Sequence, residues 1–394
     1  MKVRGYREED RASLGHVISL AFGGTDEEGE RYLDPEHNRR LDPELVYVAE
    51  EDGAPRATAT VLPLEAYVDG AAVAMGGIAA VATHPAYRRK RLAGELMRSV
   101  LRGMRERGFY LSMLDPFAHA FYRRQGYELA SESVAYDLSP AELPSSAEQS
   151  YLRDRREPDL PAMQRLLEAE SARHQLGARR SEARWRQILE RKDHNSKDTE
   201  TAIHERDGEV EGYLLYRQRE TVGEKRILEA RELAASTQRA REALLSFMAA
   251  YDSTAWRVRY STPPGEPLHP FLESSHVRAT VEPGKMLRLV DVEGALSHLK
   301  RSVPRPLVLE VYDDAIPENE GAYTVGEGNA VRGAAAPEKV TLDVRQLSQL
   351  YAGYLSAEQL YRRGMLAPGT EAALELLDAI FPEGDPWVFP LDHF

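Results

Sequence analysis

The chain has 394 residues, 42% hydrophobic and 29% charged, which is the composition of a globular protein with two or three domains. Its net charge of −13 argues against a general nucleic-acid-binding surface and is compatible with a cationic small substrate. The absence of cysteine excludes disulfides, thiolate metal sites and cysteine nucleophiles. The charged N-terminal segment lacks the apolar core of a secretion signal, and no apolar run is long enough to span a bilayer, so we expect a cytoplasmic protein without a membrane partner.

An internal repeat begins at the N-terminus. VRGYREEDRASL from Val3 and LRDRREPDLPAM from Leu152 share basic and acidic residues at one constant offset. VAEEDGAP from Val48 and IHERDGEV from Ile203 each predict a strand, an Asp-Gly turn and a second strand. The shared order of these matches predicts two copies of one α/β unit within residues 1–285.

An acidic patch follows the first predicted helix and consists of Asp26, Glu27, Glu28 and Glu30. We expect a solvated loop there. The alternative is that the patch lines an acceptor pocket and favours polycationic amines.

The stretch VATHPAYRRKRLAGELM, residues 81–97, predicts a short apolar strand, a basic turn and a helix. The turn carries Arg88, Arg89, Lys90 and Arg91, and Leu92, Leu96, Val100 and Met104 form the apolar stripe of an amphipathic helix. Free N–H groups at a helix N-terminus, with the helix dipole, favour anions, so the stretch predicts a site for a pyrophosphate-bearing ligand. The alternative is a solvated turn followed by an ordinary surface helix.

The stretch LSMLDPFAHAFYRRQGYELA, residues 111–130, predicts a strand, a short helix carrying Phe117, Phe121 and Tyr122, a turn at Gly126 and a further strand. Arg123 follows Tyr122 and places positive charge beside the phenol. Packing into an apolar core is the alternative role for this tyrosine.

The second copy differs where the first has its basic turn. Residues 233–248, LAASTQRAREALLSFM, keep the strand-to-helix character but lack the basic run and the glycine, so we expect a helix-packing turn that does not hold phosphate. Between the copies, the proline- and serine-rich residues 138–150 predict a polar linker.

A third region begins near Met286, where MLRLVDVEGAL predicts a strand that turns into a helix. Residues 306–314 and 339–347 alternate apolar and polar side chains as half-buried strands do, and the glycine-rich residues 321–336 lie between them. Residues 372–381 predict a helix, and the apolar run from Trp387 to Leu391 predicts that the tail ending at Phe394 is anchored.

The order VATHPAYRRKRLAGEL, then FYRRQGYE, resembles the GNAT superfamily of acetyl-CoA-dependent N-acetyltransferases. Its pyrophosphate loop reads Arg/Gln-x-x-Gly-x-Gly/Ala after a strand. Arg88 and Ala93 fit this pattern, whereas Arg91 stands where it has a glycine, which tolerates backbone conformations that arginine does not. Over the whole chain, the duplicated unit, the degenerate second copy, a C-terminal region similar to sterol carrier protein type two and the terminal Phe394 resemble the Eis (enhanced intracellular survival) family.

This resemblance implies an α/β (α+β) fold with tandem GNAT domains, whose mixed, mostly antiparallel sheets are flanked by helices, and a sterol-carrier-protein-like α/β domain. We expect an N-terminal acetyl-CoA-binding domain at 1–140, a degenerate GNAT domain at 150–285 and the C-terminal domain at 286–394, with its terminus in the active site. The resemblance also implies a homohexamer.

The same resemblance implies the residues of the site. The strand residues Val81, Ala82 and Thr83 would pair with the pantetheine arm of acetyl-CoA, and Phe117 and Ala118 would lie near it. The pyrophosphate would be held by Arg89, Lys90, Arg91, Leu92, Ala93 and Gly94. Tyr122 would be the general acid and the α-carboxylate of Phe394 the general base.

Acetyl transfer to an amine needs a neutral amine, a stabilised oxyanion and a protonated leaving thiolate. An α-carboxyl with a pKa of roughly 3.5 is an anion at neutral pH, and a phenol with a pKa of about 10 keeps its proton. The oxyanion donor would be a backbone N–H of the strand Val81–Thr83. His84, His119 and His393 lack metal-ligand spacing, so we expect no metal.

The sequence therefore predicts an N-acetyltransferase that uses acetyl-CoA and acts on a primary amine of a small cationic acceptor, aminoglycoside-like or polyamine-like. A protein lysine acetyltransferase is one alternative. A non-catalytic module that binds acetyl-CoA or lipid is another.

Overall fold

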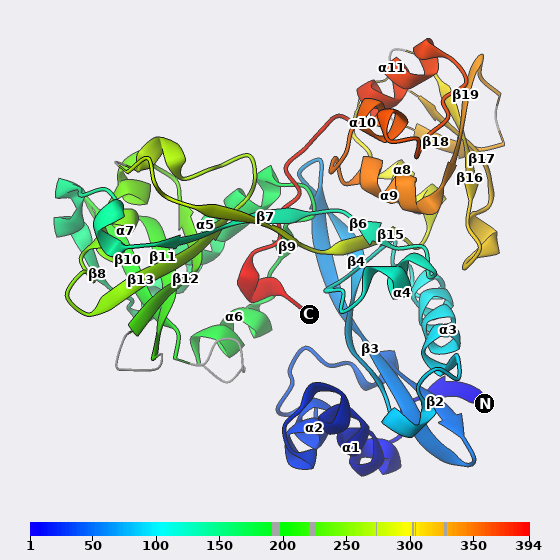
Figure 1. Ribbon diagram of the computed structural model, residues 1–394, viewed down its shortest axis with the longest axis horizontal. Coiled ribbons are helices and arrows are strands. Elements are labelled where there is room, and N and C mark those ends of the chain that lie inside the picture. The colour runs from blue at the N-terminus through cyan, green and yellow to red at the C-terminus, as the bar shows by residue number, and fades with distance from the viewer. Residues whose placement is uncertain are drawn as a thin grey trace. The chain divides into compact units, whose positions relative to one another are not determined.

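The computed structural model describes residues 1–190, 198–220, 226–272, 274–301, 303, 305–326, 329–333 and 335–394. The chain forms two compact units, which Figure 1 shows coloured from the N- to the C-terminus. Unit 1 contains residues 1–130, 285–384 and Phe394, and unit 2 contains residues 131–284 and 385–393. Within the described part of the chain, no helix is long and apolar enough to cross a membrane.

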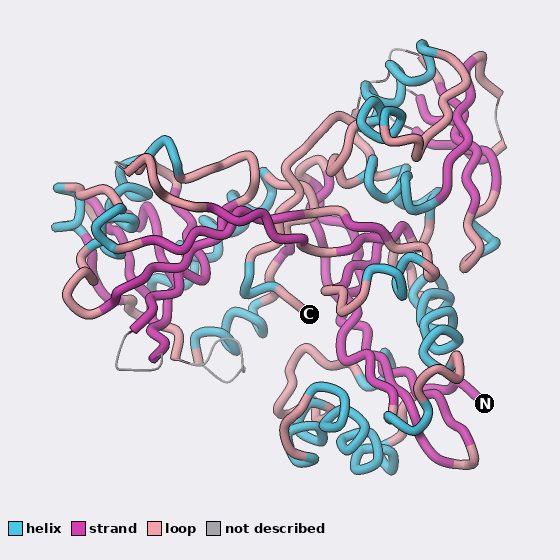
Figure 2. The backbone as a smooth tube through the Cα atoms, viewed as in Figure 1, coloured by secondary structure: helices cyan, strands magenta, loops and turns pink. Residues whose placement is uncertain are grey.

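The first sheet of unit 1 has the strand order β1-β2-β3-β4-β5-β15-β6. Its neighbours are antiparallel except β4 and β5, which are parallel. The strands are β1 (Lys2–Gly5), β2 (Val46–Glu51), β3 (Ala54–Val68), β4 (Ala71–Thr83), β5 (Leu111–Leu114), β6 (Glu128–Leu129) and β15 (Met286–Leu289). Figure 2 distinguishes these strands from the helices by colour.

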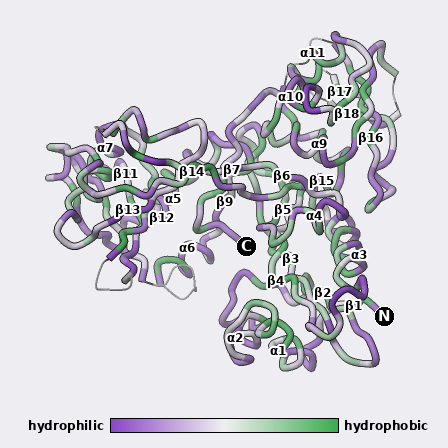
Figure 3. Tube along the Cα trace, in the orientation of Figure 1, coloured by the Kyte–Doolittle hydropathy of each residue, from purple (hydrophilic) through white to green (hydrophobic). Residues whose placement is uncertain are grey.

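The helices of this part are α1 (Arg11–Phe22), α2 (Asp26–Tyr32), α3 (Leu92–Glu106) and α4 (His119–Arg123), with 3-10 turns η1 (Glu8–Asp10), η2 (Pro43–Leu45) and η3 (Pro85–Tyr87). The predicted stripe of α3 is confirmed, because Leu92, Leu96, Val100 and Met104 are all at most 2% exposed. Hydrophobic and hydrophilic residues both occur along α3 in Figure 3. The stripe packs α3 onto the sheet and so fixes where its N-terminus points.

Two details of this part correct the sequence analysis. Three residues of the acidic patch are exposed and Glu30 is half-buried, but the patch forms helix α2 instead of a loop, because the Thr25 side chain caps the helix at the N–H of Glu28. Phe117 precedes α4 and is 70% exposed, so it is not part of the short helix.

The C-terminal part of unit 1 has a sheet of order β18-β17-β16-β19, in which β16 and β19 are parallel. Its elements are α8 (Val292–Ser297), β16 (Leu307–Tyr312), η8 (Pro317–Asn319), β17 (Gly321–Gly326), β18 (Asn329–Arg332), β19 (Glu338–Asp343), α9 (Val344–Tyr351), α10 (Ala357–Arg362) and α11 (Glu371–Ile380). The helix expected at 372–381 is confirmed as α11. The strand expected at 339–347 ends at Asp343, whose side chain accepts the Arg345 N–H and caps α9. Glu327, Gly328 and Ala334 of the glycine-rich segment lie outside the described residues.

The sheet of unit 2 has the order β14-β7-β13-β12-β11-β10-β8, with β12 and β13 parallel. Its strands are β7 (Glu132–Leu138), β8 (Leu152–Asp154), β10 (Glu200–Arg206), β11 (Glu209–Glu220), β12 (Arg226–Ala235), β13 (Ala255–Thr262) and β14 (Ala279–Pro283), and β9 is Ala178–Arg179. The helices are α5 (Leu160–Arg173), α6 (Glu182–Leu189) and α7 (Gln238–Ala249). The 3-10 turns are η4 (Pro140–Glu142), η5 (Ala147–Tyr151), η6 (Glu157–Asp159), η7 (His269–Phe271) and η9 (Pro390–Asp392), and the first two fall in the predicted linker.

The repeat predicted from the sequence is confirmed by equivalent ion pairs. Arg4 pairs with Asp10 at 2.6 Å and with Glu50 at 2.8 Å. In the second copy, Arg153 pairs with Asp159 at 2.8 Å and also with Glu205. In each copy the arginine ties a first strand to the next strand of the sheet and to the 3-10 turn before a helix.

The Asp-Gly turns of the two copies are confirmed as well. Asp52 and Gly53 have φ of 55° and 73°, and Asp207 and Gly208 have φ of 54° and 83°. Positive φ at both central residues is the geometry of a two-residue hairpin loop, which explains why the same dipeptide occurs in both copies.

The two sheets have the same strand order, but each receives one strand from beyond the other copy. In unit 1, β15 lies between β5 and β6, although it follows the whole second copy in sequence. In unit 2, β7, which follows the first copy, lies between β13 and β14. The copies have therefore exchanged equivalent strands, so neither sheet is built from one continuous segment.

Candidate active site

Strands β4 and β5 separate in the middle of the first sheet. Their parallel pairing runs from Met75 opposite Leu111 to Ile78 opposite Leu114 and ends there. Beyond Ile78, β4 continues to Thr83 and pairs with β3 on its other side, after an irregularity at Ala80, which has φ of 47°. Among the described residues no strand covers the opposite edge of β4 from residue 79 to 83. The backbone N–H and C=O groups that face this edge are therefore available to a ligand, apart from the Thr83 carbonyl, which accepts a hydrogen bond from Arg88.

The predicted strand residues Val81, Ala82 and Thr83 lie on this uncovered part of β4. The Ala82 side chain is 1% exposed, and Val81 and Thr83 are half-buried. The Arg88 guanidinium donates to the Thr83 carbonyl at 3.4 Å and folds the basic turn back toward the strand end.

The basic turn keeps a glycine-like path at the position where Arg91 departs from the pattern. Arg91 has φ of 67° and Arg89 has φ of 63°, both in the left-handed region that favours glycine. Holding an arginine there costs roughly 1–2 kcal/mol relative to a right-handed conformation. Arg89, Lys90 and Arg91 are all exposed, so the strained turn presents three cations to solvent.

The N-terminus of α3 is open. Arg91 is the N-cap residue, and among the described residues no side chain accepts a hydrogen bond from the first helical turn, which contains Leu92, Ala93 and Gly94. Unpaired N–H groups at the positive end of a helix dipole bind phosphate oxygens well. The turn and the helix start thus provide cations and backbone donors in one place.

Tyr122 is the centre of an aromatic cluster at α4. Its side chain is 2% exposed, and its ring centroid lies 4.9 Å from Phe121, 5.2 Å from Phe117 and 6.0 Å from Tyr127. Phe117 is exposed beside it, and the Ala118 carbonyl accepts the N–H of Phe121 at 3.1 Å. The structure therefore brings Phe117 and Ala118 next to Tyr122.

The two tyrosines of this cluster have different partners. The Tyr127 hydroxyl hydrogen-bonds Ser112 Oγ at 2.7 Å, whereas no described residue hydrogen-bonds the Tyr122 hydroxyl. Burial raises the pKa of Tyr122 well above its usual range, and Tyr127 and Asp115 add to the effect. Tyr122 is therefore a protonated phenol at neutral pH.

Phe394 lies where β4 and β5 part. Its ring packs on Gly77, so closely that a Cβ there would be 2.9 Å from Phe394 Cγ. The Lys285 ammonium lies 5.0 Å from the ring centroid and forms an ion pair with Asp115 at 2.6 Å. Because Gly77 pairs with Met113 of β5 and Asp115 directly follows that strand, these contacts hold Phe394 at the strand separation.

Sequence reasoning missed Gly77, Lys285 and Asp115. A glycine inside a strand often marks a close approach by another group, so the pair Gly76–Gly77 carried a signal for a packed neighbour. Lys285 and Asp115 carried none, because they meet through contacts between residues 170 positions apart.

A buried arginine supports the segment that carries Tyr122. Arg288 of β15 is fully buried, donates to the Gln125 carbonyl at 2.6 Å and pairs with Asp313 at 2.5 Å. Gly126 has φ of 80°, and a Cβ there would lie 1.5 Å from the Arg288 guanidinium. The turn after α4 is therefore held by Arg288 of β15, a strand that belongs to the third region of the chain.

His84, His119 and His393 have different surroundings. His84 caps η3, with Nδ1 accepting the Ala86 N–H at 3.2 Å, which is a structural role. His393 Nδ1 lies 2.7 Å from the Pro390 carbonyl. His119 begins α4 and is half-buried.

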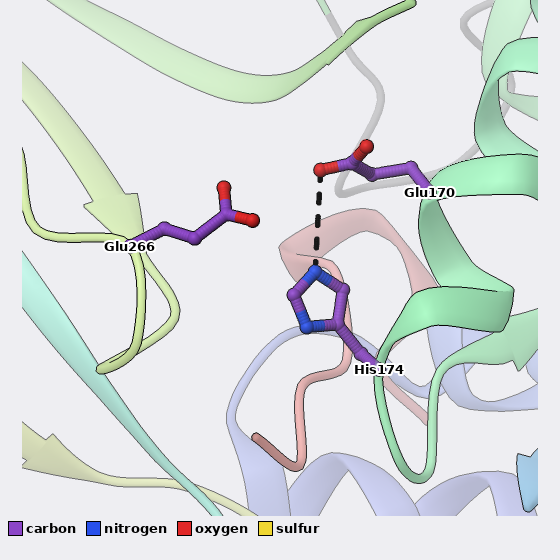
Figure 4. A group of neighbouring side chains, drawn as sticks. All are labelled: Glu170, His174 and Glu266. Carbon is purple, nitrogen blue, oxygen red and sulfur yellow. Dashed lines mark ion pairs between the residues drawn. The ribbon is translucent and has the colours of Figure 1, made fainter. Parts of the chain in front are cut away.

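Unit 2 contains the one group of histidine and carboxylate side chains in the described residues that is close enough to hold a metal ion: Glu170, His174 and Glu266 (Figure 4). Arg173 and Arg241 each form ion pairs with both of these carboxylates, at 2.9–3.4 Å. Two guanidinium groups already neutralise the carboxylates, so the cluster is an ion-pair network.

Comparison with known proteins agrees with this architecture. Residues 2–130 and 176–289 each match a model of an acetyltransferase (GNAT) domain, and residues 292–389 match a sterol carrier protein domain. An uncharacterized N-acetyltransferase of Streptomyces avermitilis is 28% identical over 333 residues, covering 79% of this chain and 81% of the relative. A second one from the same organism is 26% identical over 411 residues, covering 98% and 97%.

Solved structures show the same fold. A GCN5-related N-acetyltransferase from Anabaena variabilis superimposes over the full length of both chains with a TM-score of 0.88 and 23% identity. Eis1 from Mycobacterium abscessus superimposes over the full length of both chains with a TM-score of 0.80 and 21% identity. GNAT domains use an acyl-CoA co-substrate. The chain is therefore an N-acetyltransferase of the GNAT superfamily with an Eis-like architecture, in which two acetyltransferase domains precede a sterol carrier protein domain.

Proposed function

We propose that this enzyme transfers the acetyl group of acetyl-CoA to a primary amine of a small cationic acceptor, aminoglycoside-like or polyamine-like. The observation that carries the proposal is the position of Phe394, packed on Gly77 where β4 and β5 separate. In this proposal the α-carboxylate of Phe394 lies beside the uncovered edge of β4.

The cofactor would lie along β4. Its pantetheine arm would pair with Val81, Ala82 and Thr83 and pass Phe117 and Ala118. Its pyrophosphate would bind Arg89, Lys90 and Arg91 together with the N–H groups of Leu92, Ala93 and Gly94. From Gly77 to Thr83 the strand spans roughly 20 Å, which suits an extended arm that reaches from the basic turn to Phe394.

The proton-transfer groups would be Tyr122 and Phe394. The Phe394 carboxylate attracts the protonated amine and accepts its proton, and the neutral nitrogen then attacks the thioester carbonyl. A backbone N–H of β4 stabilises the oxyanion. As the C–N bond forms and the C–S bond breaks, the Tyr122 phenol gives its proton to the sulfur. The nitrogen loses its second proton to solvent as the amide forms, a proton from solvent restores the phenol, and the Phe394 carboxyl releases its proton to solvent.

In this proposal the catalytic domain lies within residues 1–140, the degenerate copy within residues 150–285 and the sterol-carrier-protein-like domain, which supplies Phe394, within residues 286–394. The exchanged strands β7 and β15 and the tail residues 385–393 are exceptions, because they lie in the units described above. A negative net charge of −13 suits a cationic acceptor. The resemblance to Eis proteins is the basis for proposing a homohexamer, and light scattering would measure the mass of the particle.

The test measures thiol release from acetyl-CoA across a panel of amines, with mass spectrometry of the products. One residue added after Phe394 moves the carboxylate by about 3.4 Å and should abolish transfer while acetyl-CoA binding stays intact. Phe394→Tyr keeps the ring and the terminal carboxylate and should retain most of the turnover. Normal turnover of the extended chain would remove Phe394 from catalysis. Acetylated protein lysines instead of small products, or no turnover with any amine, would replace the proposed acceptor or the proposed activity.

A further inference from the structure

The second copy has an opening equivalent to the one between β4 and β5. Strands β12 and β13 are parallel neighbours from Arg226–Glu229 opposite Ala255–Arg259, and this pairing then ends. They occupy the same positions in the strand order of their sheet as β4 and β5 do in theirs. In the first copy this opening is the proposed place of the cofactor.

In the second copy the C-terminal tail of the chain fills the opening. Trp387, Phe389 and Pro390 line one cavity with residues 231–233 of β12 and residues 260–263 at the end of β13. The space left among them is about 20 Å³, enough for one water molecule. Trp387 and Phe389 are 4% and 6% exposed and belong to the hydrophobic core of the unit. A pantetheine arm therefore has no room among these residues. A wider cavity of about 510 Å³ adjoins them and is lined by residues 229–231 of β12, residues 259–261 of β13 and Pro390 of the tail.

Hydrogen bonds fix the backbone of the tail within unit 2. The Trp387 N–H donates to the Gln175 carbonyl at 2.9 Å, and the Arg184 guanidinium donates to the Leu391 carbonyl at 2.5 Å. At the start of the tail, His174 Nδ1 lies 3.4 Å from an Asp385 carboxylate oxygen. The tail is thus held at its beginning, middle and end.

An arginine with a fully buried side chain holds the end of the tail. Arg180 forms a two-pronged ion pair with Asp392, with both N···O distances at 2.7 Å. On its other side it pairs with Glu232 of β12, which also accepts the Tyr213 hydroxyl at 2.7 Å. The side chains of Arg180 and Glu232 are 0% exposed and that of Asp392 is 5% exposed. One cation between two buried carboxylates fixes Asp392 in a single register.

We propose that the second acetyltransferase copy serves as the binding domain for the C-terminal tail, and that Arg180 is a positioning residue which sets the location of the terminal carboxylate two residues beyond Asp392. The proposal rests on the role proposed for Phe394 above. Arg180 acts through the tail backbone. Because Asp392 is held in one position, the positions of the next two residues, His393 and Phe394, are restricted as well.

The proposal first predicts the binding stoichiometry. Calorimetric titration with CoA should give one site per chain, because Trp387 and Phe389 of the tail occupy the part of the opening between residues 231–233 of β12 and residues 260–263. Two sites per chain would overturn the proposal.

The decisive variant is Arg180→Met, with Arg153→Met as its matched control. Arg153 also bridges two carboxylates in the same unit, those of Asp159 and Glu205, but it does not pair with the tail. Asp392→Asn is the milder second variant, because it keeps the pair of Arg180 with Glu232 and removes only the tail charge. It gives a result if Arg180→Met fails to fold.

Two measurements follow each variant: removal of Phe394 by a carboxypeptidase, and kcat with KM for acetyl-CoA. Arg180→Met and Asp392→Asn should speed the release of Phe394 and lower kcat about tenfold or more, with KM for acetyl-CoA within about twofold. Arg153→Met should match the wild type in both measurements.

The outcomes separate this proposal from the proposed function. If the one-residue extension abolishes turnover but both tail variants keep wild-type kcat, Phe394 is the base and Arg180 does not position it. If the extension itself keeps normal turnover, the role of Phe394 fails first. If Arg153→Met releases Phe394 faster and lowers kcat as much as Arg180→Met does, the variants have lost general stability. That result would overturn a specific role for Arg180.

Discussion

Both copies contain a strand, a turn and a helix in the same order, but the N-terminus of the helix is uncapped by a side chain in the first copy and capped in the second. In the first copy the side chain of the N-cap residue Arg91 does not cap α3, and three exposed cations precede the helix. In the second copy Thr237 caps α7 by accepting the Ala240 N–H at 3.2 Å. An N-terminus that already has internal partners gains little from a phosphate, so the difference distinguishes a ligand site from a structural turn.

An internal carboxylate completes the turn of the second copy. Glu211 accepts the Thr237 hydroxyl at 3.0 Å and the Arg239 guanidinium at 2.8 Å. The hydrogen bond from Arg239 lowers the pKa of Glu211 to about 2, so it is an anion at neutral pH. The Glu211 carboxylate therefore already lies beside the N-terminus of α7, which supports the expectation that this turn does not hold phosphate.

The largest expected effect concerns Tyr122, which has no tyrosine counterpart between Thr262 and Ala279 in the second copy. Tyr122→Phe removes the proposed acid and should lower kcat about 10²- to 10⁴-fold without changing the fold. Tyr127→Phe is the control, because it removes a hydroxyl from the same cluster that is bound to Ser112. Steady-state kinetics and circular dichroism measure both. Near-normal kcat in Tyr122→Phe would show that Tyr122 is not the general acid, so that the first copy would lack this acid as the second does.

The next effect concerns the tail that fills the second copy. Burial lowers the pKa of His174, but hydrogen bonds with Asp385 and Glu170 outweigh it and raise this pKa to about 9. Because the folded-state pKa exceeds the unfolded value of about 6.5, the stabilisation is complete below pH 6.5 and is lost as the pH rises through 9. The loss is on the order of 3 kcal/mol.

Chemical denaturation between pH 6 and 10 measures this loss. The wild type should lose more stability over this range than His174→Gln. His37→Gln removes an exposed histidine that pairs with Asp34 and should behave like the wild type. An equal pH dependence in His174→Gln and the wild type would mean that His174 does not carry a proton in the folded protein.

A smaller effect is expected at Gly77, where the first copy accommodates the terminal ring. Gly77→Ala places a Cβ 2.9 Å from both Phe394 Cγ and Leu64 Cδ1, so the ring must move. We expect kcat to fall about tenfold, with the KM for acetyl-CoA little changed. Gly5→Ala in β1 is the control, because a Cβ there meets nothing within 4 Å. Unchanged kcat in Gly77→Ala would show that the ring position is not critical.

The smallest effects concern the two turns themselves. Arg91→Gly should raise the free energy of unfolding by about 1 kcal/mol, because glycine adopts the left-handed conformation without strain, and should raise the KM for acetyl-CoA through the lost cation. Arg91→Gln loses the same charge but keeps the strain, so it separates the two effects. In the second copy, Thr237→Ala should cost about 1 kcal/mol and leave KM unchanged. A rise in KM with Thr237→Ala would show that the second turn also binds cofactor.

Features with local causes could be predicted from the sequence. The stripe on α3, the Asp-Gly hairpins and the arginine–aspartate pairs of the repeat depend on residues close together in the chain or on a fixed periodicity. The apolar tail could be recognised as anchored, because Trp387, Phe389 and Leu391 have few alternatives to burial. The alternation of apolar and polar residues predicted a strand through residue 347. The Asp343 side chain caps a helix instead, so the strand ends there.

Tertiary structure decided how the two copies share their parts. The exchange of β15 and β7 left no mark in composition or periodicity, because equivalent strands fit equivalent places in either sheet. The pair of Arg180 with Asp392 joins residues 212 positions apart, and the packing of Phe394 on Gly77 joins the end of the chain to its first sheet. The sequence by itself determined the elements, the repeat and the open helix start. The fold alone decided which opening the tail fills and where its last residue lies, because both depend on contacts between segments far apart in the chain.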